Sequence, residues 1–147
     1  ASMWFLDSTN SPALMAELSW HGRRVNFQIA RVGEGWRDLV ADCHRSIVAS
    51  FPDYELLDVK QKYGVLAFQA NPRPWVRDRT CWTDNEAAAL GAIKEDARTR
   101  SESRCEWCGA DAQLRDSRSV WLTLCSPCDA RFPDPPDRAG HIQPDET

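Results

Sequence analysis

Four cysteines in two close pairs constrain this chain more than any other feature of its sequence. Cys105 and Cys108 form the first pair and Cys125 and Cys128 the second, in the spacing C-x2-C-x16-C-x2-C. A C-x2-C turn brings two thiolates to one ion, and zinc prefers four such ligands in a tetrahedron. The spacing therefore predicts one zinc ion held by all four cysteines. Because four thiolates leave no position for water or substrate, we expect the zinc to be structural.

Disulfides and iron are the alternatives for these thiols. The chain carries six cysteines, a number that also suits disulfides in a secreted protein. Cys43 and Cys81 stand alone, however, and a chain of 147 residues is long enough to fold without such cross-links. A metal site in a reducing compartment fits this distribution better. An iron site with the same four ligands stays open as an alternative to zinc.

The segments before the cysteines predict a small α+β domain. Residues 25–29 alternate apolar and polar side chains, as in a half-buried strand, and we expect a hairpin with the apolar run before them. Residues 36–48 carry apolar side chains at helical spacing, which predicts an amphipathic helix that ends near Pro52. Residues 57–68 alternate again on both sides of Gly64, which predicts a second hairpin.

A capping-box pattern at Thr83 and Glu86 predicts a second helix that runs toward the first cysteine pair. We therefore expect a small antiparallel sheet with two packed helices, extended by a C-terminal zinc ribbon. The expected core residues are Phe27, Ile29, Trp36, Leu39, Val40, Ile47, Leu57, Val59, Leu66 and Phe68.

The chain divides into three expected parts. Residues 3–104 form the α+β domain, which ends in a long helix, residues 105–128 form the four-cysteine ribbon, and residues 129–147 form a flexible tail rich in proline and acidic residues. Because structural zinc contributes folding free energy on the order of 10 kcal/mol in small zinc modules, the ribbon should unfold when the metal is removed. From the sequence, we expect the α+β domain to survive, since its core does not depend on the ion.

Three segments together resemble a known family. These are "GEGWRDLVADCHRSIV", "LLDVKQKYGVLAFQA" and the ribbon with "CEWCG" and "TLC". They are similar to a family of small, mostly uncharacterised bacteriophage and prophage proteins, over residues 33–128. Its most specific part is "VKQKYGVLAF", where the family usually reads like VKEKFGGLRF. In many members the second pair of metal ligands, here termed the second knuckle, is Cys and His, whereas this chain has Cys125 and Cys128. The resemblance implies a shared fold and a phage-related context, and no agreed activity.

The charge of the chain bears on its partner. The formal net charge is -4 and the isoelectric point about 5.4, whereas dedicated nucleic-acid binders usually carry a basic surplus. No run of 18 apolar residues and no signal-peptide pattern occurs, so we expect a cytoplasmic protein without a membrane partner. An unidentified protein is the expected partner, and the sequence does not indicate an oligomeric state.

Cationic and aromatic residues outside the expected core are the candidates for partner contact. The candidate partner-binding residues are Arg73, Trp75, Arg77, Arg79, Trp107 and Trp121. The main hypothesis is an accessory protein that binds another protein, including an inhibitor or immunity-type protein. The alternative is a nucleic-acid-binding zinc-ribbon protein that uses the Arg-rich loop at residues 73–79 and the helix at residues 94–104.

An enzyme is the third class of function. Cys43 beside His44 suggests a nucleophile and a base. Adjacent residues of a helix point about 100° apart, so we expect Cys43 in the core and His44 at the surface. His21 and His141 lie in no nuclease-like motif. We therefore expect no catalytic residues and no enzymatic activity.

Overall fold

The computed structural model describes residues 12–19 and 30–132. The hairpin expected through residues 21–22, the strand expected at residues 25–29 and the tail beyond Phe132 lie outside these residues. The described elements, in chain order, are α1 (Pro12–Leu18), β1 (Ala30–Arg31), the 3-10 helix η2 (Glu34–Trp36), α2 (Arg37–Ser50), β2 (Glu55–Lys62), β3 (Val65–Asn71), α3 (Asp84–Ser101), β4 (Gln113–Arg115), β5 (Leu122–Leu124) and α4 (Ser126–Arg131). The predicted α+β class, with a cysteine cluster near the C-terminus, is confirmed.

The predicted hairpin at the centre of the sheet is confirmed. Strands β2 and β3 pair antiparallel, and Lys62 faces Val65 across the turn. Tyr63 and Gly64 both have positive φ, 54° and 85°, as a two-residue hairpin turn requires.

The short strand β1 makes the sheet mixed rather than wholly antiparallel. Ala30 pairs with Val59 of β2 in the parallel direction. Because α2 lies between β1 and β2 in the chain, it carries the backbone to the starting end of the sheet, as a parallel connection requires.

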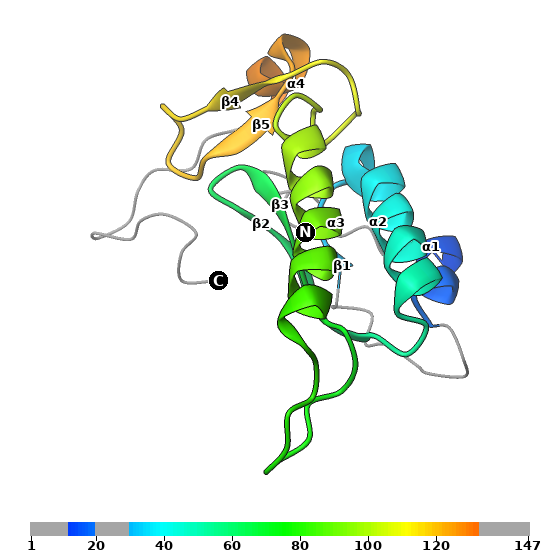
Figure 1. Cartoon of the computed structure of the whole chain (residues 1–147). Coiled ribbons are helices and arrows are strands. Elements are labelled where there is room, and N and C mark those ends of the chain that lie inside the picture. Colours follow the sequence, from blue (N-terminus) through cyan, green and yellow to red (C-terminus); the bar gives the residue numbers. More distant parts are fainter. Residues whose placement is uncertain (1–11, 20–29, 133–147) are drawn as a thin grey trace.

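The first described element corrects one expectation. The apolar run before residue 20 was expected to form a strand of a hairpin, but Pro12–Leu18 forms helix α1. Leu14 and Leu18 are four residues apart, which places both on one side of a helix, and both are buried. Figure 1 shows α1 beside α2, and α2 beside α3.

The core agrees with the expected set except at one position. Trp36, Leu39, Val40, Ile47, Val59, Leu66 and Phe68 are buried as predicted, while Phe27 and Ile29 lie outside the described residues. The prediction that Leu57 belongs to the core is wrong, because Leu57 is 47% exposed, whereas Leu56 is only 7% exposed. The register of β2 against β3 shifts between Leu56 and Asp58, so Leu57 is the extra residue of a bulge.

Helix α3 packs against β3 and α2, and two of its three buried side chains are small. Thr83 caps it, accepting a hydrogen bond from the Glu86 amide while the Glu86 carboxylate accepts from the Thr83 amide, as predicted. Ala97 and Ser101 are buried toward the rest of the domain. The Ser101 hydroxyl accepts a hydrogen bond of 2.9 Å from the Leu66 amide of β3. The end of α3 is thereby fixed beside the hairpin, immediately before the first cysteine pair.

Candidate metal centre

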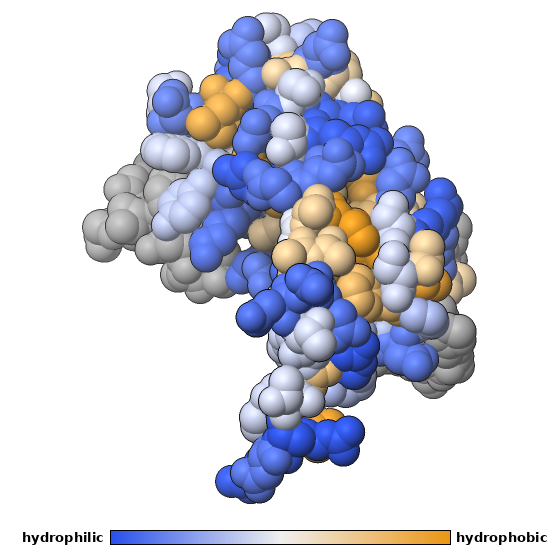
Figure 2. Space-filling model, in the orientation of Figure 1, coloured by the Kyte–Doolittle hydropathy of each residue, from blue (hydrophilic) through white to orange (hydrophobic). Residues whose placement is uncertain are grey.

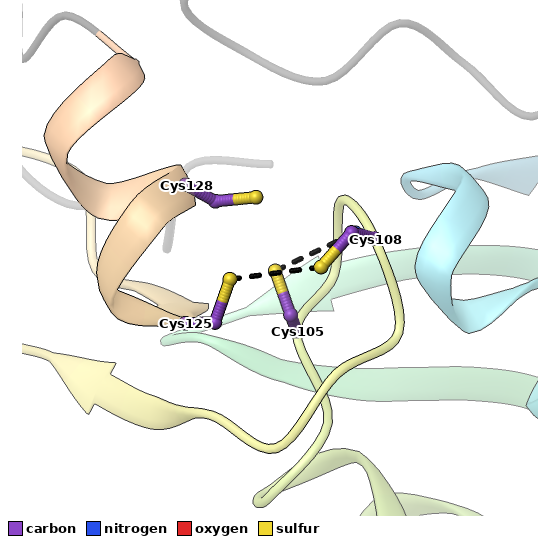
Figure 3. A group of neighbouring side chains, drawn as sticks. All are labelled: Cys105, Cys108, Cys125 and Cys128. Carbon is purple, nitrogen blue, oxygen red and sulfur yellow. Dashed lines mark hydrogen bonds between the residues drawn. The ribbon is translucent and has the colours of Figure 1, made fainter.

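The four predicted cysteines lie together. One sulfur from each of Cys105, Cys108, Cys125 and Cys128 falls in a group whose atoms are all within 4.8 Å of one another. Figure 3 shows the first two side chains on the loop after α3 and the last two at the start of α4, with all four sulfurs gathered in one place. Cys105, Cys125 and Cys128 are buried and Cys108 is exposed.

The distances fit one shared ion better than cross-links. All six cysteines are free thiols. The sulfurs of Cys108 and Cys125 are 3.6 Å apart, far longer than a disulfide bond of about 2.05 Å. Four sulfurs at about 2.3 Å from one ion in a tetrahedron would lie roughly 3.8 Å from each other. The cluster therefore has the donor set and the spacing of a metal site.

Each knuckle is shaped by local backbone signals. Gly109 has a φ of 86°, as expected for the turn after Cys108, and its amide donates to the Cys105 carbonyl at 2.9 Å. Cys125 is the N-cap of α4, and a hydrogen bond from the Cys128 amide lowers the pKa of its thiol to about 7. Burial raises the pKa of Cys128. A thiolate at Cys125 is thus favoured by the backbone before any ion is considered.

A two-stranded sheet joins the two cysteine pairs. Leu114 of β4 pairs with Thr123 of β5. The guanidinium of Arg118 donates to the Asp129 carboxylate at 2.8 Å and to the Phe132 carbonyl at 3.1 Å, which ties the loop between these strands to α4. The ribbon, residues 105–128, is therefore also held to residues 129–132 by contacts other than the cysteines.

The ribbon also binds the α+β domain through the segment at Gly33–Trp36, which the sequence did not reveal. The Gly35 amide donates to the Glu106 carbonyl at 2.8 Å, and the Gly33 amide donates to the Glu106 carboxylate at 3.1 Å. The indole Nε1 of Trp36 donates to the Arg104 carbonyl at 2.8 Å. A side chain at position 35 would overlap the Cys105 carbonyl, so only glycine allows this approach.

A second contact joins the ribbon to the turn of the hairpin. The Thr123 hydroxyl donates to the Gly64 carbonyl at 2.6 Å. Glycine is favoured at position 64 by its positive φ, and a Cβ atom there would also require the Leu114 side chain to move. Figure 1 shows the ribbon lying over the turn end of β2 and β3. Two glycines that predicted turns therefore also shape the surface on which the ribbon lies.

Glu106 is a buried acid at this contact. It lies between the cysteines of the first knuckle and is 1% exposed. Burial raises the pKa of its carboxyl to about 8, and the hydrogen bond from the Gly33 amide opposes this shift. Its second oxygen, Oε1, is buried without a hydrogen bond from any described residue. The sequence does not indicate that this acid is buried, because an exposed glutamate is the ordinary case.

The candidate partner-binding residues fall in two regions. Arg73, Trp75, Arg77 and Arg79 share the loop between β3 and α3, whereas Trp107 and Trp121 belong to the ribbon. Both ribbon tryptophans are partly buried. Trp107 lies against Phe132 with ring centroids 4.4 Å apart, and Trp121 lies against Tyr63 at 5.9 Å. Their role in partner binding stays a prediction.

Cys43 and His44 do not form a reactive pair. Cys43 is buried as predicted, and burial raises the pKa of its thiol to about 12. His44 was expected at the surface, which is wrong, because it is buried and its Nδ1 lies 2.8 Å from the Tyr54 hydroxyl. Helix α1 packs on α2, so the buried side of α2 is wider than its apolar stripe. Burial lowers the pKa of His44.

The described residues thus form an α+β domain that carries a four-cysteine cluster with the geometry of a metal site. Comparison with protein-family models, with curated proteins and with solved structures finds no match to this chain. In residues 12–19 and 30–132, no helix has the length and apolar character needed to cross a bilayer.

Proposed function

We propose that this chain is a zinc-stabilised accessory protein that acts by binding another protein, without turnover. The observation that carries this proposal is a pair of exposed apolar side chains, Trp75 and Val76, on the loop between β3 and α3, residues 72–82, here termed the finger. Trp75 is 63% exposed and Val76 is 45% exposed. Figure 2 shows the finger standing away from the body of the molecule. An exposed tryptophan on a projecting loop is a typical anchor of a protein interface.

The finger is held in one shape by its own contacts. The guanidinium of Arg73 donates two hydrogen bonds to the Glu86 carboxylate, at 3.0 and 2.6 Å, and one to the Cys81 carbonyl at 2.6 Å. The Val76 amide donates to the Cys81 sulfur at 2.9 Å. These contacts join the base of the finger to the start of α3. A preorganised loop loses less conformational entropy on binding, which favours affinity.

The charges near Trp75 indicate what the finger would meet. Arg77 and Arg79 are exposed beside Trp75, and neither forms an ion pair among the described residues. A pocket that accepts an indole and carries acidic groups on its rim would match this surface. Inhibitor and immunity-type proteins that block another macromolecule act in this way, without chemistry. The phage or prophage context rests on the resemblance of residues 33–128 alone.

The nucleic-acid alternative is less favoured because three of the expected phosphate-binding arginines are already paired, although Arg77, Arg79 and Lys94 form no ion pair among the described residues. Arg73 is bound to Glu86, as described above. Arg98 binds Glu102 at 3.0 Å, and Arg100 binds Asp42 at 3.2 Å. An arginine that must leave its own carboxylate gains little from a phosphate. The net charge of -4 adds to this argument.

Zinc is the metal that the cluster suits best. Four cysteine sulfurs in a tetrahedral arrangement are the ligand set of structural zinc sites. The four thiolates fill the shell, so the ion would stabilise the ribbon and would not act on a substrate. Elemental analysis of protein purified without added metal tests this directly, with one zinc per chain expected. Iron in its place, or no metal, would refute the assignment.

A site-specific cross-link tests the partner. A photoreactive phenylalanine analogue at position 75 should capture a protein from a bacterial lysate, and the same analogue at Ala88, exposed on α3, should not. Arg77→Glu with Arg79→Glu should abolish the capture. Equal capture from both positions, or cross-links only to nucleic acid, would refute protein binding through the finger.

A further inference from the structure

A groove of about 650 Å³ lies between β3, α3 and the ribbon. Residues 65–69 of β3 all line it, and residues of α3 from Gly91 to Arg98, together with Glu102 just after the helix, form the opposite wall. Successive side chains of a strand point to opposite faces, so a groove that touches five residues in a row follows the backbone edge of the strand. In the described sheet, β3 is the edge strand on the side away from β1.

The backbone of β3 presents hydrogen-bonding groups along this edge. The two-residue turn makes Lys62 and Val65 a hydrogen-bonded pair, so alternate residues of β3 from Val65 onward bond to β2. The residues between them direct their amide and carbonyl groups away from β2. The Leu66 amide confirms this direction, because it donates to the Ser101 hydroxyl. Phe68 is the next outward residue, and it lines the groove. Because the Leu66 amide is already bonded to Ser101, an extended segment lying there can pair with β3 from Phe68 onward, as an added strand.

The charges of the groove favour a segment that carries carboxylates. Three cations, Lys62, Lys94 and Arg98, line it with two acids, Glu95 and Glu102. Both acids are bound by Arg98, at 3.2 and 3.0 Å. No ion pair joins Lys62 or Lys94 to a carboxylate in residues 12–19 and 30–132. The groove is therefore cationic on a chain whose net charge is -4.

Apolar side chains and the ribbon complete the groove. Tyr63 and Leu114 line it and are 39% and 41% exposed. They offer contact area to apolar side chains of a bound segment. Thr123, whose hydroxyl binds the Gly64 carbonyl, also lines the groove. The site is thus complete only while the ribbon lies against the hairpin.

We infer that this groove binds an extended segment of another protein, which adds to the edge of β3 as a strand and places Asp or Glu side chains near Lys62 and Lys94. The inference rests on the proposed protein-binding function, but it concerns a surface separate from the finger. Main-chain hydrogen bonds would supply affinity, and the lysines would supply the preference for acidic sequences.

The test is an NMR titration of the metal-loaded full chain with three synthetic peptides. The first alternates threonine with glutamate, the second has lysine in place of glutamate, and the third is the first with every amide N-methylated. We expect the first peptide to shift the amide signals of residues 65–69 and 91–98. The second should bind at least tenfold more weakly, and the third should not bind, because it lacks the amides that pair with β3.

Variants locate the binding to the groove. A Cβ atom at Gly91 meets nothing within 4 Å, so Gly91→Phe should fill the groove without disturbing the fold and should abolish the shifts. Ala89→Phe, on the exposed side of α3, is the matched control and should bind normally. Lys94→Glu should weaken binding about tenfold, and Trp75→Ala in the finger should leave it unchanged.

Other results would overturn the inference. Equal binding of the acidic and basic peptides, binding of the N-methylated peptide, or unchanged binding by Gly91→Phe would each do so. Concentration-dependent shifts of the β3 amides without peptide would assign the edge to a second copy of this chain instead. The peptide titration reports on the groove and the cross-linking experiment reports on the finger. Because Trp75→Ala changes only the finger, a failure of the groove inference is distinguishable from a failure of the proposed binding through the finger.

Discussion

Removal of the metal should destabilise the α+β domain as well as the ribbon. Four hydrogen bonds join the two parts, donated by the amides of Gly33, Gly35 and Ala112 and by the hydroxyl of Thr123. At about 1 kcal/mol each, their loss would lower the free energy of unfolding by about 4 kcal/mol. Domains are stable by only about 5–15 kcal/mol in total. The expectation from sequence, that the domain survives intact, would then be wrong.

Hydrogen exchange measured by mass spectrometry resolves this effect along the chain. After chelation, amides of α2 and of the β2–β3 hairpin should exchange faster, and the melting temperature should fall by about 10 to 20 °C. Cys125→Ser should reproduce both changes without a chelator. Cys81→Ser is the matched control, since Cys81 lies outside the cluster and should keep both the metal and the protection.

One pattern of hydrogen exchange would refute this reasoning. If only residues 105–128 lose protection when the metal leaves, while α2 and the hairpin exchange as before, the four hydrogen bonds do not couple the parts. Protection restored by added zinc after chelation would show that the change is reversible and due to the ion.

Three further perturbations test the packing. Gly35→Ala should lower the melting temperature, because the new methyl group overlaps the ribbon backbone, whereas Gly91→Ala on open helix surface should raise stability by about 0.5–1 kcal/mol. Leu56→Ala should cost about 2–5 kcal/mol in urea unfolding and Leu57→Ala about 0.5 kcal/mol or less; a reversed order would contradict the bulge. The hydrogen bonds from the arginine of the finger lower the pKa of Glu86 from 4.5 to about 2. The ion pair between Arg73 and Glu86 should therefore be fully formed above pH 4.5 and be lost as the pH falls through about 2. Tryptophan fluorescence anisotropy can follow the release of the finger, and release already near pH 5 would contradict this expectation.

Features with a local cause were predictable from the sequence. The capping box at Thr83, the positive φ of Gly64 and Gly109, and the helical spacing of residues 36–48 each follow from neighbouring residues. The cysteine cluster also belongs here, because the C-x2-C spacing places two sulfurs together in each cysteine pair whatever the rest of the chain does. The pairing of β4 with β5 follows once the two knuckles must meet.

Features set by contacts between distant segments were not predictable. The bulge that exposes Leu57 depends on how β2 meets β3, since strict alternation would bury Leu57 and expose Leu56. The burial of His44 depends on α1 and on the hydroxyl of Tyr54, neither of which the helical pattern contains. The parallel pairing of Ala30 depends on the path of α2 across the sheet.

The contacts of the ribbon explain two glycines in the segments that resemble the phage family. Gly35 and Gly64 are the positions where a side chain would overlap the ribbon, at Cys105 and Leu114. Trp36 fills the core with its ring, and its indole nitrogen donates to the carbonyl of Arg104, the residue before the ribbon. These residues lie in "GEGW" and "KYG", which the sequence presents as ordinary turn signals. They are better understood as one half of an interface whose other half is the four-cysteine ribbon, and this is why the metal is expected to support the fold of the whole described chain.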